Sequence, residues 1–139
     1  MQLESGVAMS IPVEASGLAD VITRYRYAYL MTTTANGAPH AVAVSAVLQD
    51  GALIVDRIGR RTRENALARP AVGLVWPPES AEDYSLIVDG QAAVVGDQMR
   101  ITPTRAVLHR SAPSPRPQAP GACGSDCVEL EMRKETSGR

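Results

Sequence analysis

Four arginines lie close together in the middle of the chain, and their chemistry is suited to binding an anion. Arg57, Arg60, Arg61 and Arg63 fall within the stretch 56–70, which reads DRIGRRTRENALARP. Three of them precede or begin a predicted short helix, where unpaired backbone N–H groups attract negative charge. Each guanidinium adds a planar set of donors that matches a phosphate group. The run therefore predicts a phosphate-binding loop.

The same run has a simpler interpretation as a solvated basic loop. Of the 14 lysines and arginines only Lys134 is a lysine, so the preference for arginine extends over the whole chain. Arg63 lies one turn into the predicted helix, where solvent or an acidic residue is a sufficient partner. The formal net charge is −1, which argues against general nucleic-acid binding, because that function favours a basic protein.

Length and composition indicate one domain. A chain of 139 residues buries roughly 70% of its unfolded surface on folding and needs no disulfide. No stretch reaches the eighteen or so apolar residues of a membrane helix, and the N-terminus lacks the pattern of a signal peptide. We therefore expect a cytoplasmic protein without a membrane partner. Cys123 and Cys127 cannot close a zinc site alone; plain thiols are favoured, with a local disulfide or redox pair as the alternative.

Alternating apolar residues and turn signals predict a mainly antiparallel β protein. Asn36-Gly37 and Asp50-Gly51 have the form of tight hairpin turns, so the first three strands should form a meander. The predicted strands are 27–34, 40–48, 52–56, 72–76, 84–95, 99–101 and 127–132. The predicted helices are 16–25, a helix capped by Thr62 that ends near Ala68, and a helix from Thr102 to about His109 with Pro103 in its first turn.

The domain organisation follows from these elements. We expect residues 1–15 to form an N-terminal arm, 16–133 the folded domain and 134–139 a polar tail. Within the domain, the stretch 111–122 is a proline-rich loop that cannot form regular structure. About seven short strands with tight turns imply a small antiparallel barrel. Phe is absent, so Val, Leu, Ile and Ala must build the core.

The order of these motifs resembles the flavin-binding split-barrel family, often called pyridoxamine-5'-phosphate-oxidase-like, over about residues 27–95. The resemblance is carried by the hairpin TTTANGAPHAVAV, by the strand, basic loop and helix of ALIVDRIGRRTRENALARPAVGLVW, by the strand YSLIVDGQAAVV, and by the meander order. No single motif is specific, but their order and spacing together support the assignment. The implied fold is mainly β with short helices, an antiparallel Greek-key split barrel of the FMN-binding type.

The resemblance implies a homodimer with two equivalent cofactor sites at the subunit interface. Family members hold FMN, and in some branches the deazaflavin F420; haem is a less favoured ligand. The strand that begins at His40 aligns with the segment beside the flavin ring, Asp56 with a flavin-contacting position, and Arg61 with a phosphate-binding arginine. The candidate cofactor-binding residues are His40, Ala41, Val42, Ala43, Asp56, Arg57, Arg60, Arg61 and Thr62.

Two positions of the phosphate motif differ from the family pattern. Thr62 stands where the family has a lysine, and Arg60 where it has a serine. The threonine hydroxyl still donates one hydrogen bond, and Arg60 restores the positive charge. The C-terminal region PRPQAPGACGSDCVELEM lacks the tryptophan-bearing motif of true pyridoxamine phosphate oxidases, so that particular activity is not expected.

Several other residues have both a structural and a functional interpretation. His40 is either a turn histidine with a backbone partner, a ring beside the flavin, or an axial haem ligand. His109 suits the last turn of a helix, or it reaches the cofactor pocket together with Arg110. Trp76 is more consistent with core or interface packing than with a stacking platform. If their segment is extended, tyrosines at period two share a strand face, which is common at an interface: Tyr25, Tyr27 and Tyr29.

Two classes of function remain open. The first is an oxidoreductase that passes a hydride or electrons between a flavin-type cofactor and a small organic substrate, with the chemistry carried by the cofactor. The sequence has no Ser-His-Asp arrangement, carboxylate pair or metal motif, so no side chain is expected to be catalytic. The second class is a binding module that holds a flavin, F420 or haem without turnover.

Overall fold

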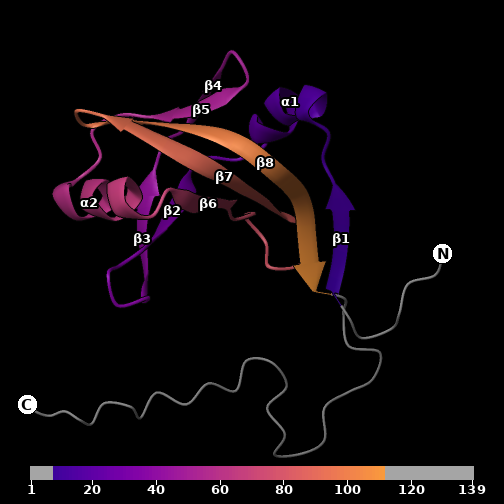
Figure 1. Cartoon of the computed structure of the whole chain (residues 1–139). Helices are drawn as coiled ribbons and strands as arrows, with labels where there is room; N and C mark the ends of the chain where they lie inside the picture. Colours follow the sequence, from indigo (N-terminus) through magenta and orange to yellow (C-terminus); the bar gives the residue numbers. More distant parts are fainter. Residues whose placement is uncertain (1–7, 112–139) are drawn as a thin grey trace, which may run out of the picture.

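Eight strands form one antiparallel sheet in residues 8–111, the part of the chain that this computed structural model describes (Figure 1). The strands are β1 Ala8–Pro12, β2 Ala28–Thr33, β3 Pro39–Val44, β4 Val47–Gln49, β5 Ala52–Val55, β6 Ala71–Trp76, β7 Ser85–Val95 and β8 Gln98–Ser111. The helical segments are η1 Ala15–Gly17, α1 Leu18–Ile22 and α2 Arg60–Ala68. The predicted fold class, mainly β with short helices, is confirmed.

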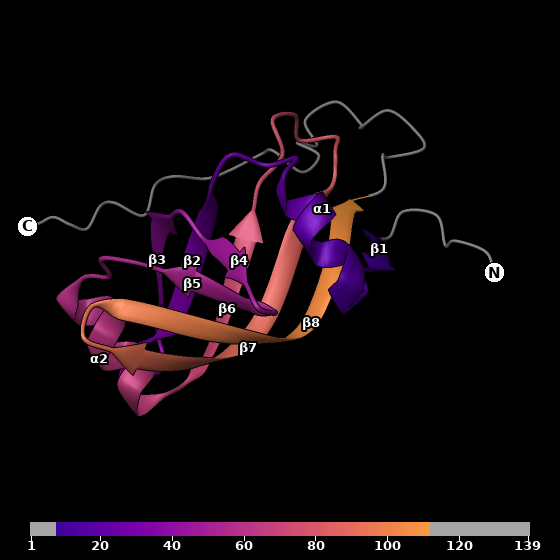
Figure 2. The same ribbon diagram turned by 90° about the horizontal axis from the view of Figure 1, so that it is seen from above.

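The sheet curls on itself because its two end strands follow one another in the sequence. The strand order is β3-β2-β6-β7-β8-β5-β4, and β1 pairs with β8 beside this path. β3 and β4 end that order on opposite sides, yet only Ser45 and Ala46 separate them in the chain. The two ends of the curved sheet must therefore meet, although among the described strands no pairing joins β3 to β4 or β5. The barrel is split along this seam (Figure 2).

Apolar side chains from the central strands fill the barrel. The largest fully buried residues are Leu30, Leu53, Val55, Leu74, Leu86, Val88, Met99 and Ile101. Burial of each such side chain contributes about 1.5–3 kcal/mol, so this cluster is the main source of stability for the barrel. Trp76 is also buried in the core, as expected from its place at the end of an apolar strand.

The predicted strand 40–48 is two strands, β3 and β4. The predicted meander of three consecutive paired strands is therefore wrong. The break at Ser45 and Ala46 carries the chain from one end of the sheet order to the other. The hairpins β2–β3 and β4–β5 form where the turn residues predict them, and Gly37 and Gly51 have positive φ values of 89° and 79°. Local turn chemistry set each hairpin, whereas closure of the barrel decided which strands lie together.

Strand β8 is longer than predicted, and the helix predicted over 102–109 is wrong. Pro103 lies inside the strand, paired with Gly90 beside a β-bulge. The bulge accommodates a residue that cannot donate a backbone hydrogen bond. A side chain at Gly90 would come within 2.6 Å of the Thr102 carbonyl oxygen, so glycine lets the two backbones approach. Pairing with β7, β5 and β1 outweighs the helix signal of the Thr102-Pro103 dipeptide.

The helical segments also differ from prediction, α2 at its N-terminal end and the first helical region at its C-terminal end. Gly59 is the N-cap of α2 and Arg60 its first residue, so Thr62 is buried within the helix and does not cap it. The end of α2 at Ala68 agrees with the prediction. The first helical region is shorter than the predicted 16–25, and the predicted N-terminal arm contains strand β1.

Three predicted features lie outside the described residues: the closing strand 127–132, the pair Cys123 and Cys127, and the tail 134–139. The proline-rich stretch beyond Ser111 also lies outside them. Among the helices of residues 8–111, none is long and apolar enough to cross a membrane.

Candidate cofactor site

A cavity of about 350 Å³ lies between strand β3 and the loop that joins β5 to α2. Its walls come from the two sides of the open seam, because β3 ends the sheet on one side and β5 lies next to the other end. The lining residues are His40, Val42, Ala43, Val44, Arg57, Ile58, Gly59, Arg60, Arg61 and Thr62. The fold thus brings most of the candidate residues to one place, although they come from two separate segments of the chain.

The N-terminus of α2 forms part of this cavity. The first hydrogen bond of the helix runs from the Arg63 N–H to the Gly59 carbonyl oxygen, at 3.0 Å. The N–H groups of Arg60, Arg61 and Thr62 therefore have no acceptor within the helix. Unpaired N–H groups and the helix dipole both favour an anion at this position.

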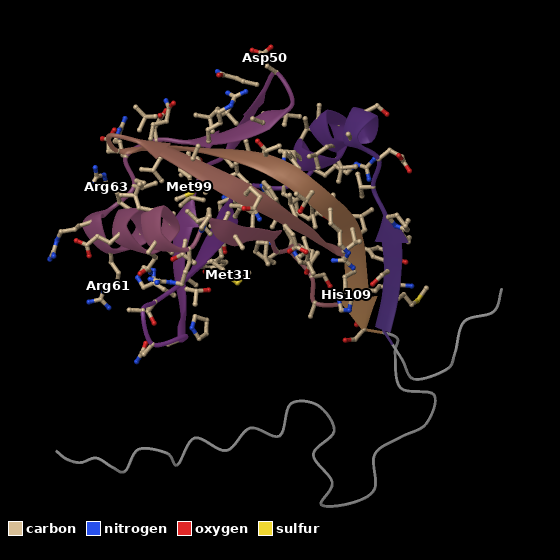
Figure 3. The ribbon with its side chains drawn as sticks, in the orientation of Figure 1. Met31, Asp50, Arg61, Arg63, Met99 and His109 are labelled. Carbon is tan, nitrogen blue, oxygen red and sulfur yellow. The ribbon has the colours of Figure 1, made fainter. Side chains whose placement is uncertain are left out.

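Two arginines of the cavity keep their full positive charge available. Within residues 8–111, neither Arg57 nor Arg61 forms an ion pair. Arg60 lies 3.9 Å from Glu64, but the pair is exposed and contributes little in water. Figure 3 shows Arg61 and Arg63 leaving α2 on different sides of the helix. Arg57 and Arg61 are therefore the cations best placed to bind an anion in the cavity.

Strand β3 supplies an uncharged wall. Its side chains alternate, with His40, Val42 and Val44 half-buried and Ala41 and Ala43 exposed. Ala41 does not line the cavity, in contrast to its alignment with a flavin-contacting segment. Because β3 ends the sheet order, one edge of its backbone has no strand partner among the described residues. Small side chains beside free backbone groups suit a flat ring with a polar edge.

His40 and Asp56 occupy different environments. Nδ1 of His40 is buried and has no hydrogen-bond partner within residues 8–111, which costs about 1–3 kcal/mol for a buried polar atom. A polar group added beside this ring would therefore be stabilised. Asp56 does not line the cavity; instead its Oδ1 accepts a hydrogen bond of 2.9 Å from Nε2 of Gln98.

Helix α2 is held in place by residues that the sequence analysis did not single out. Nδ2 of buried Asn65 donates to Oγ1 of Thr32 on β2, at 3.0 Å. Nε of Arg69 donates to the Thr33 carbonyl oxygen, at 2.8 Å. These bonds fix the helix against β2, the neighbour of β3, and so fix the distance from the arginines to the β3 wall. Asn65 shares the buried side of α2 with Thr62 and Ala66, and the spacing of these three small or uncharged residues was the available signal.

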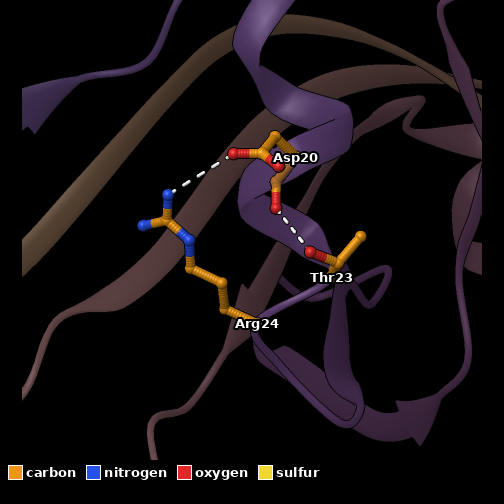
Figure 4. A network of polar contacts seen from close by, with 3 residues as sticks. All are labelled: Asp20, Thr23 and Arg24. Carbon is orange, nitrogen blue, oxygen red and sulfur yellow. Dashed lines mark hydrogen bonds and ion pairs between the residues drawn. The ribbon is translucent and has the colours of Figure 1, made fainter.

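A second hollow, of about 420 Å³, is lined by different residues and presents less free charge. Its two arginines face carboxylates: Arg24 lies 3.5 Å from Asp20 (Figure 4), and Arg26 lies 3.8 Å from Glu79. Tyr25 donates its hydroxyl to the Tyr84 carbonyl oxygen, at 2.8 Å. Burial raises the pKa of Tyr25, Arg24 lowers it, and Asp83 raises it, with a net increase, so this donor keeps its proton. Both arginines of this hollow have carboxylate partners, whereas Arg57 and Arg61 of the first cavity have none within residues 8–111.

The remaining candidates do not reach the cavity. His109 lies on β8 opposite Ser85, far from Arg61 (Figure 3). The guanidinium of Arg110 stacks on the Tyr84 ring at 4.8 Å and donates to the Glu82 carbonyl oxygen at 3.2 Å. His109 is therefore part of the paired strand β8, Arg110 contacts Tyr84 and Glu82, and neither residue lines the cavity.

The described residues form a small split barrel in which a loop rich in arginine faces the uncharged strand β3 across a cavity. Residues 17–133 match the family model described as Pyridoxamine 5'-phosphate oxidase, and the chain belongs to this flavin-binding family. An uncharacterized protein of Mycobacterium bovis is 39% identical over 136 residues, which cover 86% of this chain and 96% of that protein. The family resemblance of the motifs is thereby confirmed.

Solved structures share the fold at low sequence identity. An FAD-binding protein from Mesorhizobium loti is 15% identical, with a TM-score of 0.60, and the match covers 76% of this chain and 99% of that one. A protein described as an F420 reductase is 17% identical, with a TM-score of 0.54, and the match covers 63% of this chain and 93% of that one. These similarities show the split-barrel fold, and they do not carry over a ligand.

Proposed function

We propose that this protein binds a flavin-type cofactor in the cavity between β3 and residues 56–63, here called the arginine loop, and that it is an oxidoreductase acting on a small organic substrate. The observation that carries the proposal is the placement of two arginines without ion-pair partners, Arg57 and Arg61, beside a free helix N-terminus and an uncharged strand. FMN is the first candidate and F420 the second. Haem is a less favoured ligand.

The residues present fit such a cofactor. Arg61, with Arg57 or Arg60 assisting, would bind the cofactor's phosphate, because guanidinium groups form charge-assisted hydrogen bonds with phosphate. The flat ring is placed along His40, Val42 and Ala43. F420 carries a longer acidic tail than FMN, and the number of arginines in the loop is compatible with it. FMN is kept first because it is the commoner ligand of the family.

The chain's own residues bind and orient the cofactor. A bound flavin accepts and donates a hydride or electrons, and in such proteins the surrounding groups supply position and electrostatics. The half-buried face of β3 excludes water from one side of the ring. Its free backbone edge would offer donors and acceptors to the polar edge of the ring. No side chain of the cavity is assigned a catalytic role.

The second candidate function is a binding module that holds a flavin, F420 or haem without turnover. It is favoured by the two departures in the phosphate motif, since Thr62 replaces the family's lysine and Arg60 its serine. Thr62 is only 3% exposed, so its hydroxyl cannot replace the long reach of a lysine. Turnover with a reductant and a substrate separates the two functions, because both require the same cavity.

The purified protein is expected to carry or take up a flavin-type cofactor. Its visible absorption spectrum should be that of a flavin or of a deazaflavin, and a ligand at 100 times its dissociation constant should stabilise the fold by about 2.7 kcal/mol. Thermal unfolding with FMN, F420 and haem in parallel measures this. Stabilisation by F420 and not by FMN would reverse the order of candidates, and stabilisation by none of the three would contradict the proposal.

We further propose that the protein is a homodimer with its cofactor at the subunit interface. Tyr27 and Tyr29 contact each other edge to face, with ring centroids 5.4 Å apart, and are 41% and 40% exposed. Large exposed aromatic rings are typical of interfaces. Sedimentation at micromolar concentration should show a species of twice the 14.8 kDa chain mass. A single species at the chain mass would remove both the dimer and the interfacial site.

A further inference from the structure

The turn between β7 and β8 holds the arginine loop at three points. The Ile58 N–H donates to the Asp97 carbonyl oxygen at 2.9 Å. Gln98 donates from Nε2 to Oδ1 of Asp56 at 2.9 Å, and Arg63 donates from Nε to the Gly96 carbonyl oxygen at 2.8 Å. The tip of the β7–β8 hairpin lies beside α2 in both views (Figures 1 and 2). Residues 96–98 are called the clasp turn below.

Arg57 lies between two of these contacts and has a backbone conformation that is unfavourable for arginine. Its φ is +59°, in the left-handed region that disfavours a side chain with a Cβ atom. Such a conformation persists only where the surroundings impose it, and it is concentrated at functional sites. The neighbours on both sides, Asp56 and Ile58, are the residues bonded to the clasp turn. The clasp turn therefore supplies the constraint that keeps Arg57 in this conformation.

We infer that the clasp turn positions Arg57 for anion binding, and that Gly96 and Gln98 are positioning residues for the cofactor site. This inference rests on the proposed function, because Arg57 lines the cavity assigned to the cofactor phosphate. The bonds from Asn65 and Arg69 hold the far part of α2 against β2. The clasp turn, which joins β7 to β8, instead holds Asp56 and Ile58, the two neighbours of Arg57.

The test exploits two glycines with matched surroundings. Gly96 has φ +61°, Gly51 has φ +79°, and a Cβ added to either would meet nothing within 4 Å. Both valine variants therefore strain a left-handed backbone position, in the clasp turn for Gly96→Val and in the β4–β5 turn for Gly51→Val. Figure 3 shows the neighbouring Asp50 at the tip of that hairpin, away from α2. Comparable losses of melting temperature are expected for both variants.

Of the two glycine variants, only Gly96→Val should weaken cofactor binding. We expect the dissociation constant for FMN, or for F420 if the parent protein binds that instead, to rise about tenfold in Gly96→Val. Gly51→Val should remain within about twofold of the parent. Gln98→Ala, an exposed change that spares the backbone, should raise the dissociation constant by a smaller factor and serves if Gly96→Val fails to fold. Equal dissociation constants in the Gly96, Gln98 and Gly51 variants would overturn the inference.

A double-mutant cycle separates positioning from general loosening. In an Arg57→Ala background, Gly96→Val should change the dissociation constant by about twofold or less, since its effect acts through the missing guanidinium. The same tenfold loss with and without Arg57 would overturn the inference while leaving the proposed function intact. A parent protein that binds neither FMN nor F420 would overturn both. Amide exchange at Ile58, faster in Gly96→Val and unchanged in Gly51→Val, confirms that the clasp contact is lost.

Discussion

Replacement of Arg61 by alanine is expected to weaken cofactor binding by roughly ten- to a hundredfold. Arg61 lines the cavity, has no ion-pair partner among the described residues, and follows the first residue of α2. Loss of one hydrogen bond to a charged group costs about 1.5–3 kcal/mol, which corresponds to this range of affinities. Titration of the purified variant with FMN and with F420, followed by flavin fluorescence or calorimetry, measures the change.

A second arginine-to-alanine variant, outside the cavity, shows whether the effect is specific to Arg61. Arg105 is exposed, pairs with Asp89 at 3.6 Å, and does not line the cavity. Arg105→Ala removes the same charge and should leave the dissociation constant unchanged. The dependence of binding on salt should weaken in Arg61→Ala only, because one fewer ion contact is then screened. An unaltered affinity in Arg61→Ala would exclude the arginine loop from the site.

Replacement of Gly90 by alanine is expected to destabilise the fold by about 1–3 kcal/mol, the usual cost of an overpacked interior position. The added Cβ would lie 2.6 Å from both the Thr102 carbonyl oxygen and Cγ2 of Ile101. A backbone oxygen cannot turn aside as a side chain does, so the two strands must separate at the bulge. Urea unfolding of the parent and the variant measures the difference in the free energy of unfolding.

Gly73 provides the matched control for this substitution. It also lies within a strand, and its nearest neighbour would be Cε of Met31 at 3.6 Å, an ordinary contact distance. Gly73→Ala should therefore be neutral or slightly stabilising, because alanine restricts the unfolded chain more than glycine does. Equal stability of the Gly73 and Gly90 variants would show that the close approach of β7 and β8 is not required at this point.

The sequence predicted those features that depend on neighbouring residues. Asn36-Gly37 and Asp50-Gly51 set two hairpins because their backbone conformations suit tight turns. The end of α2 before Pro70 follows from the restriction that proline places on the residue before it. The arginine run was recognised because its charges are adjacent in the chain. The family motifs were recognised for the same reason, since their order and spacing can be read along the chain.

Other features depend on contacts between segments that are distant in the sequence, and they follow from the folded structure alone. The helix predicted at Thr102-Pro103 gave way to strand β8 because β7, β5 and β1 all pair with it. The split of 40–48 into β3 and β4 follows from closure of the barrel, which also places β3 across the seam from the arginine loop. The clasp turn meets Asp56 and Ile58 across about forty positions of sequence, a pairing that local propensity cannot encode.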